Sequence, residues 1–179
     1  MKKLVFPAGI VMVVFLLCIS SCKEDPQPCN GVTGTGPVVI QTRTFQDIRA
    51  VVSQLPCDIL VQYDTATRLE ISAQQQILDV LQSRQSGSTL TLSFSQTVCS
   101  TSGILIHMYT PSLERFTLMG NGVVDIRDIQ TSTFEFSLQG NGSALLAGTS
   151  NQSFLDILGN GEIHAYSLLS HAAKASILG

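Results

Sequence analysis

The sequence has few of the side chains that catalysis and nucleic-acid binding usually require. Only 13% of its 179 residues are charged, and acidic residues outnumber basic ones, with a formal net charge of −3. No arginine-rich or lysine-rich run follows the N-terminus. A nucleic-acid-binding surface needs a basic patch or stripe. The composition therefore predicts no nucleic-acid partner.

Catalytic and metal-binding motifs are also missing. The three histidines, His107, His164 and His171, show no i, i+4 spacing, and no Cys-x-x-Cys pair is present. No Gly-x-Ser-x-Gly elbow and no phosphate-binding glycine loop occur. We therefore predict a protein that is not an enzyme, with no catalytic residues, no metal and no cofactor.

The long apolar run of the sequence lies at its N-terminus. Met1-Lys2-Lys3 precede an almost unbroken apolar stretch from Leu4 to Ile19, which is typical of a secretory signal. The stretch is shorter than the roughly 20 residues that a spanning helix needs. Ile19-Ser20-Ser21-Cys22 resembles a bacterial lipobox, whose cysteine becomes acylated. We predict a lipoprotein signal peptide over residues 1–21 and lipidation of Cys22, with several acyl chains as the membrane anchor.

The residues after Cys22 indicate where the anchored protein is displayed. Lys23-Glu24-Asp25 resemble the surface-export signal of Bacteroidota lipoproteins. Residues 22–36 then contain prolines and glycines without any periodicity, which is typical of a flexible tether. We expect an outer-membrane lipoprotein on the cell surface, with a periplasm-facing position as the alternative.

The cysteines of the mature chain suggest one disulfide. Removing residues 1–21 leaves 158 residues, with 8 basic and 13 acidic side chains, enough for one domain over residues 37–179. Besides Cys22 they include Cys29, Cys57 and Cys99, in an exported and oxidising compartment. Because Cys29 lies in the predicted tether, we predict a disulfide between Cys57 and Cys99.

From Pro37 onward the sequence is dominated by short β segments. In several of them apolar and polar residues alternate, as in Leu90, Leu92 and Phe94, which is typical of half-buried strands. Ile77, Leu78 and Leu81 indicate one short helical turn. The predicted strands are Val38–Thr44, Ala50–Val52, Asp58–Gln62, Arg68–Ser72, Thr89–Phe94 and Ile104–Tyr109.

The last third contains a repeat of 19 to 20 residues, which is the length of one solenoid coil. Alternating strands flank each Gly-Asn-Gly corner, and a fourth copy begins at Ala175. Glycine and asparagine tolerate positive φ, so we interpret the corners as structural, with stacked asparagine amides as a ladder. A ligand-binding ridge is the alternative. The corners are Gly120, Asn121, Gly122, Gly140, Asn141, Gly142, Gly159, Asn160 and Gly161.

The acidic residues do not follow this repeat. The equivalents of Asp125 in the next two copies are Leu145 and His164, so no ladder of carboxylates forms and calcium binding is not predicted. Glu135, Asp156 and Glu162 occupy different repeat positions. A stacked carboxylate site of the kind found in β-helical polysaccharide lyases is therefore not expected, although such an enzyme stays a rival hypothesis.

Four parts of the sequence are informative together: Thr42-Arg43-Thr44-Phe45, the strand from Cys57 to Gln62, Thr110-Pro111-Ser112-Leu113 and the Gly-Asn-Gly corners. In these parts the sequence resembles the head GIN domain family, adhesin-like domains common in Bacteroidota lipoproteins. The resemblance implies an all-β, right-handed parallel β-helix-like solenoid with coils of about 20 residues. Members of this family continue for further coils, so we expect a chain that is truncated at its C-terminus.

The resemblance, the anchor and the missing catalytic cluster together suggest a function. We expect a non-enzymatic cell-envelope lipoprotein that presents a solenoid binding module, an adhesin for a glycan or a protein. Its other partner would be the membrane, through the lipid anchor. The alternatives are a structural envelope protein that self-associates and a carbohydrate-active β-helix enzyme.

Overall fold

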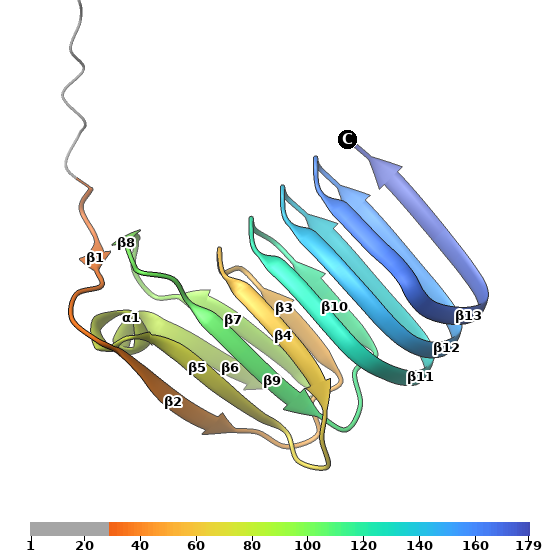
Figure 1. The fold of residues 1–179 in the computed structure, drawn as a ribbon, viewed down its shortest axis with the longest axis horizontal. Coiled ribbons are helices and arrows are strands. Elements are labelled where there is room, and N and C mark those ends of the chain that lie inside the picture. The colour runs from red at the N-terminus through yellow and green to blue at the C-terminus, as the bar shows by residue number, and fades with distance from the viewer. Residues whose placement is uncertain (1–28) are drawn as a thin grey trace, which may run out of the picture.

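The computed structural model describes residues 29–179 and has an all-β fold (Figure 1). The predicted signal peptide and Cys22 lie outside these residues. A two-stranded sheet and an eleven-stranded sheet contain the strands. Ten strands and one helix are short: β1 (Val32–Thr33), β2 (Val38–Thr44), β3 (Ala50–Ser53), β4 (Asp58–Tyr63), β5 (Arg68–Gln74), α1 (Gln75–Val80), β6 (Leu81–Ser86), β7 (Thr89–Phe94), β8 (Val98–Ser100), β9 (Leu105–Thr110) and β10 (Arg115–Leu118). Three strands are long: β11 (Val123–Gln139), β12 (Ser143–Leu158) and β13 (Glu162–Leu178).

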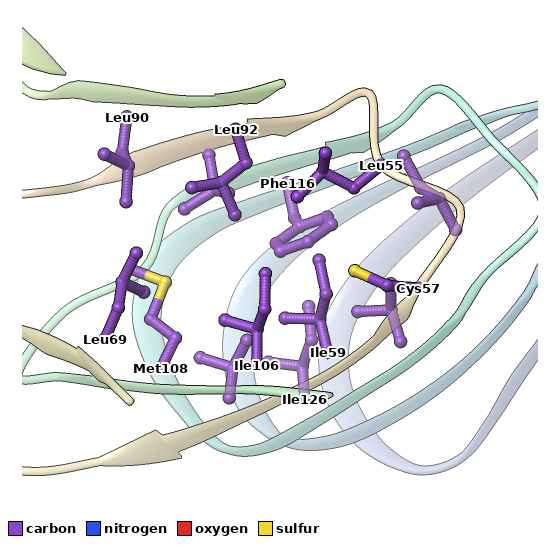
Figure 2. Close-up of a cluster of buried hydrophobic side chains, with 14 of the residues drawn as sticks. Leu55, Cys57, Ile59, Leu69, Leu90, Leu92, Ile106, Met108, Phe116 and Ile126 are labelled. Carbon is purple, nitrogen blue, oxygen red and sulfur yellow. The ribbon is translucent and has the colours of Figure 1, made fainter. Parts of the chain in front are cut away.

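The large sheet curls on itself because its long strands are bent. The first half of β11 pairs with β4, and its second half pairs with β10. The strand order β2-β5-β9-β4-β11-β10-β3-β7-β6 therefore doubles back at β11 and forms two layers. Figure 2 shows Leu90 and Leu92 facing Ile59 and Ile106 across the core, with Phe116 between the layers.

The bends lie where β11 and β12 adopt positive φ. Asp128 has φ 60° and Gly148 has φ 134°, and the pairing of β11 with β12 shifts register between Ile126 and Ile129. A Cβ atom at Gly148 would lie 2.3 Å from the backbone N and O of Ile129. Only glycine satisfies both the backbone conformation and the close approach at this bend.

The C-terminal strands β10, β11, β12 and β13 pair in parallel, in the register that the sequence copies suggest. Leu118 is opposite Leu138, Leu138 is opposite Ile157, and Ile157 is opposite Ile177. The rings of Phe116 and Phe136 stack with centroids 5.8 Å apart. Equivalent side chains thus lie one strand spacing apart.

The predicted all-β class is confirmed, and the large sheet is open and curled. All six predicted strands are present with ends that differ by two residues or fewer, and the predicted helical turn is α1. The sequence analysis missed β1, β6 and β8. The described residues contain no helix long and apolar enough to cross a membrane. The right-handed parallel β-helix of the sequence analysis stays a prediction.

The two ends of the core are covered differently. At the sealed end, α1 places Ile77 and Leu78 in the core. The Arg43 guanidinium of β2 also donates hydrogen bonds there, to the carbonyl oxygen of Leu81 and the hydroxyl of Ser83, each 2.9 Å long. At the open end, β13 pairs with β12 and with no other strand of residues 29–179. We use these two names below.

The predicted Cys57–Cys99 disulfide is contradicted. Cys99 bonds to Cys29 instead, with their Cα atoms 5.8 Å apart. The reason is that β1 pairs with β8, which brings the end of the predicted tether beside Cys99. Cys57 is a free thiol in the core, between the two layers (Figure 2). Burial raises the pKa of the Cys57 thiol to about 12, which makes it unreactive.

Candidate functional site

The Gly-Asn-Gly corners form a stack whose polar groups bind one another. Nδ2 of Asn141 donates to Oδ1 of Asn121 at 3.3 Å, and Nδ2 of Asn160 donates to Oδ1 of Asn141 at 3.4 Å. A Cβ atom at Gly142 would lie 2.5 Å from the carbonyl oxygen of Gly122. The predicted amide ladder is present, and these contacts support a structural role for the corners.

The acidic residues and histidines of the sequence analysis are dispersed. Asp125, Leu145 and His164 are register partners, as the sequence copies suggest, so this position holds one carboxylate. Glu135 accepts a hydrogen bond from Arg115, its register partner on β10, away from Asp125. Within residues 29–179, no three His, Cys, Asp or Glu side chains are close enough to hold a metal ion.

A groove of about 230 Å³ lies on the outer face of β11, β12 and β13, beside the bend. Because side chains alternate along a strand, its lining residues on each strand are mainly those that point away from the core. β12 lies between β11 and β13, so Arg127 and Tyr166 stand on opposite sides of the small Ala147. The lining residues are Asp125, Arg127, Leu145, Leu146, Ala147, His164, Tyr166 and Ser167.

One side of the groove is an ion pair. Nε and Nη2 of Arg127 donate to Oδ2 of Asp125, at 3.0 Å and 2.6 Å. The hydrogen bonds and the charge of Asp125 raise the pKa of Arg127 above its ordinary value, so the guanidinium stays charged. Nη1 of Arg127 has no hydrogen-bond partner within residues 29–179. The pair therefore holds a rigid donor beside a carboxylate that can still accept.

The opposite side of the groove is aromatic. Tyr166 is 92% exposed, although an aromatic side chain usually buries much of its surface. Its ring centroid lies 5.8 Å from that of His164, with the two planes tilted by 31°. Nε2 of His164 lies 3.2 Å from the carboxylate of Glu162. The two rings form a shelf at the edge of the groove.

Sequence reasoning missed this groove. It considered Asp125 and His164 singly and did not select Arg127, Ala147 or Tyr166. The repeat gave no indication of these residues, because the positions that line the groove hold a different residue type in each copy. One signal was available: Asp125 and Arg127 are two residues apart in a strand, so their side chains share a face.

A second groove, of about 510 Å³, lies at the bend itself between β11, β12 and β13. Its hydroxyl groups bond within the protein. Ser150 contacts the hydroxyls of Ser153 at 2.7 Å and Ser170 at 3.2 Å, and Ser170 donates to the carbonyl oxygen of Ala172. This groove contains no ion pair among the described residues and no tyrosine, unlike the one between Arg127 and Tyr166.

Solved structures of low sequence identity share this fold. An adhesin-like protein of Bacteroides fragilis, described as a putative adhesin, is 20% identical with a TM-score of 0.64, over 82% of this chain and 79% of its own. A putative adhesin of Parabacteroides merdae is 14% identical with a TM-score of 0.52, over 82% and 80% of the two chains. A protein of Parabacteroides distasonis described as a putative lipid binding protein is 15% identical with a TM-score of 0.53, over the same shares.

The sequence itself has one informative match. No curated protein sequence matches the chain. Residues 47–179 match the family model described as "Putative auto-transporter adhesin, head GIN domain". This span includes every Gly-Asn-Gly corner and every strand of the large sheet except β2. The chain belongs to the head GIN domain family of adhesin-like proteins.

Proposed function

We propose that this protein is a non-enzymatic lipoprotein of the cell envelope that presents a binding module for an extracellular glycan or protein. In this proposal the parallel strands of β10 to β13 are coils of a right-handed β-helix-like solenoid, and they display a ligand-binding outer face. Cys22 carries the lipid anchor, and the residues after it hold the module away from the membrane. Membership of an adhesin-like family supports this function and an envelope location.

One observation carries the proposal. The outer faces of β11, β12 and β13 place exposed side chains of three copies in parallel register, and a groove lies across all three strands. Such a sheet forms a rigid platform, because the middle strand β12 pairs with β11 on one side and with β13 on the other. A rigid platform lowers the entropy that binding must overcome.

Binding is tested directly with the purified protein. We expect the full chain to bind selected members of a glycan array or selected extracellular-matrix proteins, in a saturable manner. A matched sample that is unfolded by urea should lose this binding. Uniform absence of binding to both panels by the folded protein would overturn the proposed function.

The envelope location is tested on intact cells. A cell-surface lipoprotein is cleaved by added protease without lysis, whereas a periplasm-facing one is cleaved after the outer membrane is opened. Replacing Cys22 with serine should release the protein from the membrane fraction in either case. Retention of Cys22→Ser in the membrane would contradict lipid anchoring through this residue.

Self-association is a second candidate function, and one observation favours it. The outer edge of β13 has no partner strand among the described residues, and Leu169, Ile177 and Leu178 are exposed on it. Free edges of this kind pair readily with other strands. A structural envelope protein would form concentration-dependent oligomers in sedimentation and would bind no soluble ligand. A monomer at all concentrations contradicts this alternative.

A further inference from the structure

We infer that the groove between Arg127 and Tyr166 is a saccharide-binding site that takes one uncharged pyranose ring with two neighbouring hydroxyl groups. This inference rests on the proposed function and names the ligand class and the residues. The ring would lie with its apolar face on Tyr166 and its hydroxyl groups toward Asp125 and Arg127.

The ion pair suits a vicinal diol. Asp125 and Arg127 project from the same face of β11 and hold each other through two nitrogen atoms of the guanidinium. A sugar hydroxyl accepts and donates, so one hydroxyl can accept from Nη1 of Arg127 while its neighbour donates to the carboxylate. Hydrogen bonds to ionised groups are stronger than those between neutral groups. Because the pair is preformed, the ligand does not have to order either side chain.

The aromatic shelf suits the apolar face of the ring. A pyranose presents several C–H groups on one face, and these carry a slight positive charge. The faces of aromatic rings are negative, so the two surfaces attract while both lose water. Tyr166 is the most exposed of the large apolar and aromatic side chains of the described residues. Such a ring is available for stacking without any rearrangement of the strands.

The floor of the groove limits the size of the ligand. Ala147 is small, whereas Arg127 and Tyr166 beside it are long, so a hollow forms between them. Its volume of about 230 Å³ is below the roughly 300–1,000 Å³ of pockets that hold drug-sized ligands. The groove therefore accommodates a single ring, with the remainder of a chain outside it.

The local charges favour an uncharged ring. Asp125 neutralises Arg127, and Glu162 beside His164 adds a negative charge at the other side of the groove. Acidic residues also exceed basic ones in the whole sequence. An anionic sugar would approach a surface of its own sign, which slows and weakens association.

The test compares the full-length protein with variants on an array of uncharged and acidic glycans. Tyr166→Ala, Arg127→Ala and Ala147→Leu should each weaken binding to an uncharged glycan at least tenfold. Arg115→Ala is the matched control for Arg127→Ala, because both arginines are 57% exposed and both form an ion pair. Tyr63→Ala is the control for Tyr166→Ala, because Tyr63 is also an exposed tyrosine. Circular dichroism and thermal melting check that each variant is folded.

Each outcome decides the inference. Loss in the three groove variants, with both controls unchanged, supports it. Binding of an uncharged glycan that the groove variants retain overturns the inference, because the ligand is then held elsewhere, and the proposed function stands. If only acidic glycans or proteins bind, the inference is likewise overturned and the proposed function stands. Absence of any binding overturns the inference and the proposed function together.

Discussion

The sealed end and the open end of the core bury the same kind of side chain to different degrees. One repeat position shows this clearly, since Leu118 is fully buried, Leu138 is fully buried, Ile157 is half-buried and Ile177 is 73% exposed. The chemistry of the position hardly changes along this row. The change comes from the number of strands that cover it on either side.

The difference shows what a stack of coils requires. Each coil covers its neighbours and cannot bury its own apolar face alone, so the stability of the stack depends on neighbouring interfaces and on the covering of its ends. In this protein α1, Arg43 and the Cys29–Cys99 disulfide all lie at the sealed end. The groove between Arg127 and Tyr166 lies on the other side, toward the open end. Stability and ligand binding are therefore predicted to respond to different substitutions.

The largest expected effect is a gradient along the repeat position. Leu118→Ala should lower the free energy of unfolding by about 2–5 kcal/mol, because it removes buried methyl groups and leaves a cavity. Ile157→Ala should cost less, and Ile177→Ala should change it by less than about 0.5 kcal/mol. Urea unfolding measures all three, with unchanged m-values as the control. Equal losses at Leu118 and Ile177 would show that the covering of this position does not decrease toward the open end.

The second largest loss of stability is expected when the Cys29–Cys99 disulfide is removed. Cys29→Ser should lower the free energy of unfolding by about 2–4 kcal/mol, because the bond closes a long loop in the unfolded chain. The two cysteines are 70 residues apart. Cys57→Ala is the control, since it keeps this bond. Peptide mapping without reduction should find Cys29 joined to Cys99, and a Cys57–Cys99 peptide would contradict the pairing.

Substitution of Arg43 tests the stability of the sealed end, with a smaller expected loss. Arg43→Ala should lower the free energy of unfolding by about 1.5–3 kcal/mol, because its charged hydrogen bonds to the carbonyl oxygens of Leu78 and Leu81 are lost. Arg43→Lys should restore little, since an ammonium lacks the planar fork. Thermal or urea unfolding measures both. Arg49→Ala, which breaks exposed ion pairs, should cost clearly less than Arg43→Ala.

The smallest effect is expected at the Gly-Asn-Gly corners, which link successive strands from β10 to β13. Asn141→Ala removes both hydrogen bonds of the amide ladder and should cost about 0.5–1.5 kcal/mol. Asn160→Ala removes one of them and should cost less. Gln139→Ala, beside the same corner, should be close to neutral. A larger loss of unfolding free energy for Asn160→Ala than for Asn141→Ala would contradict a ladder in which each amide hydrogen bond contributes equally.

Local patterns predicted much of the fold. The Gly-Asn-Gly corners follow from the backbone freedom of glycine and asparagine, and the register of β10 to β13 follows from their spacing. Apolar alternation predicted β7 correctly. In these cases the residues that determine the structure are neighbours in the sequence.

Features that depend on distant residues were not predicted. The Cys29–Cys99 bond requires the pairing of β1 with β8, and both strands are too short to show alternation. The groove arises because register shifts at the bend place Arg127 and Tyr166 beside Ala147. No local pattern of one strand reveals which residues three strands bring together.

The Cys29–Cys99 bond also determines how the domain would carry mechanical load. A pull on the chain before Cys29 passes through the sulfur atoms to Cys99, so the residues between them bear none of it. With about 3.5 Å of extension per residue, the bond holds back roughly 240 Å of chain until it is reduced. Tension then reaches β9 and the coils beyond it first, while β2 to β7, with α1, lie inside an unloaded loop. Under shear, a single covalent link would keep the backbone from β2 to β7 out of the direct path of the load.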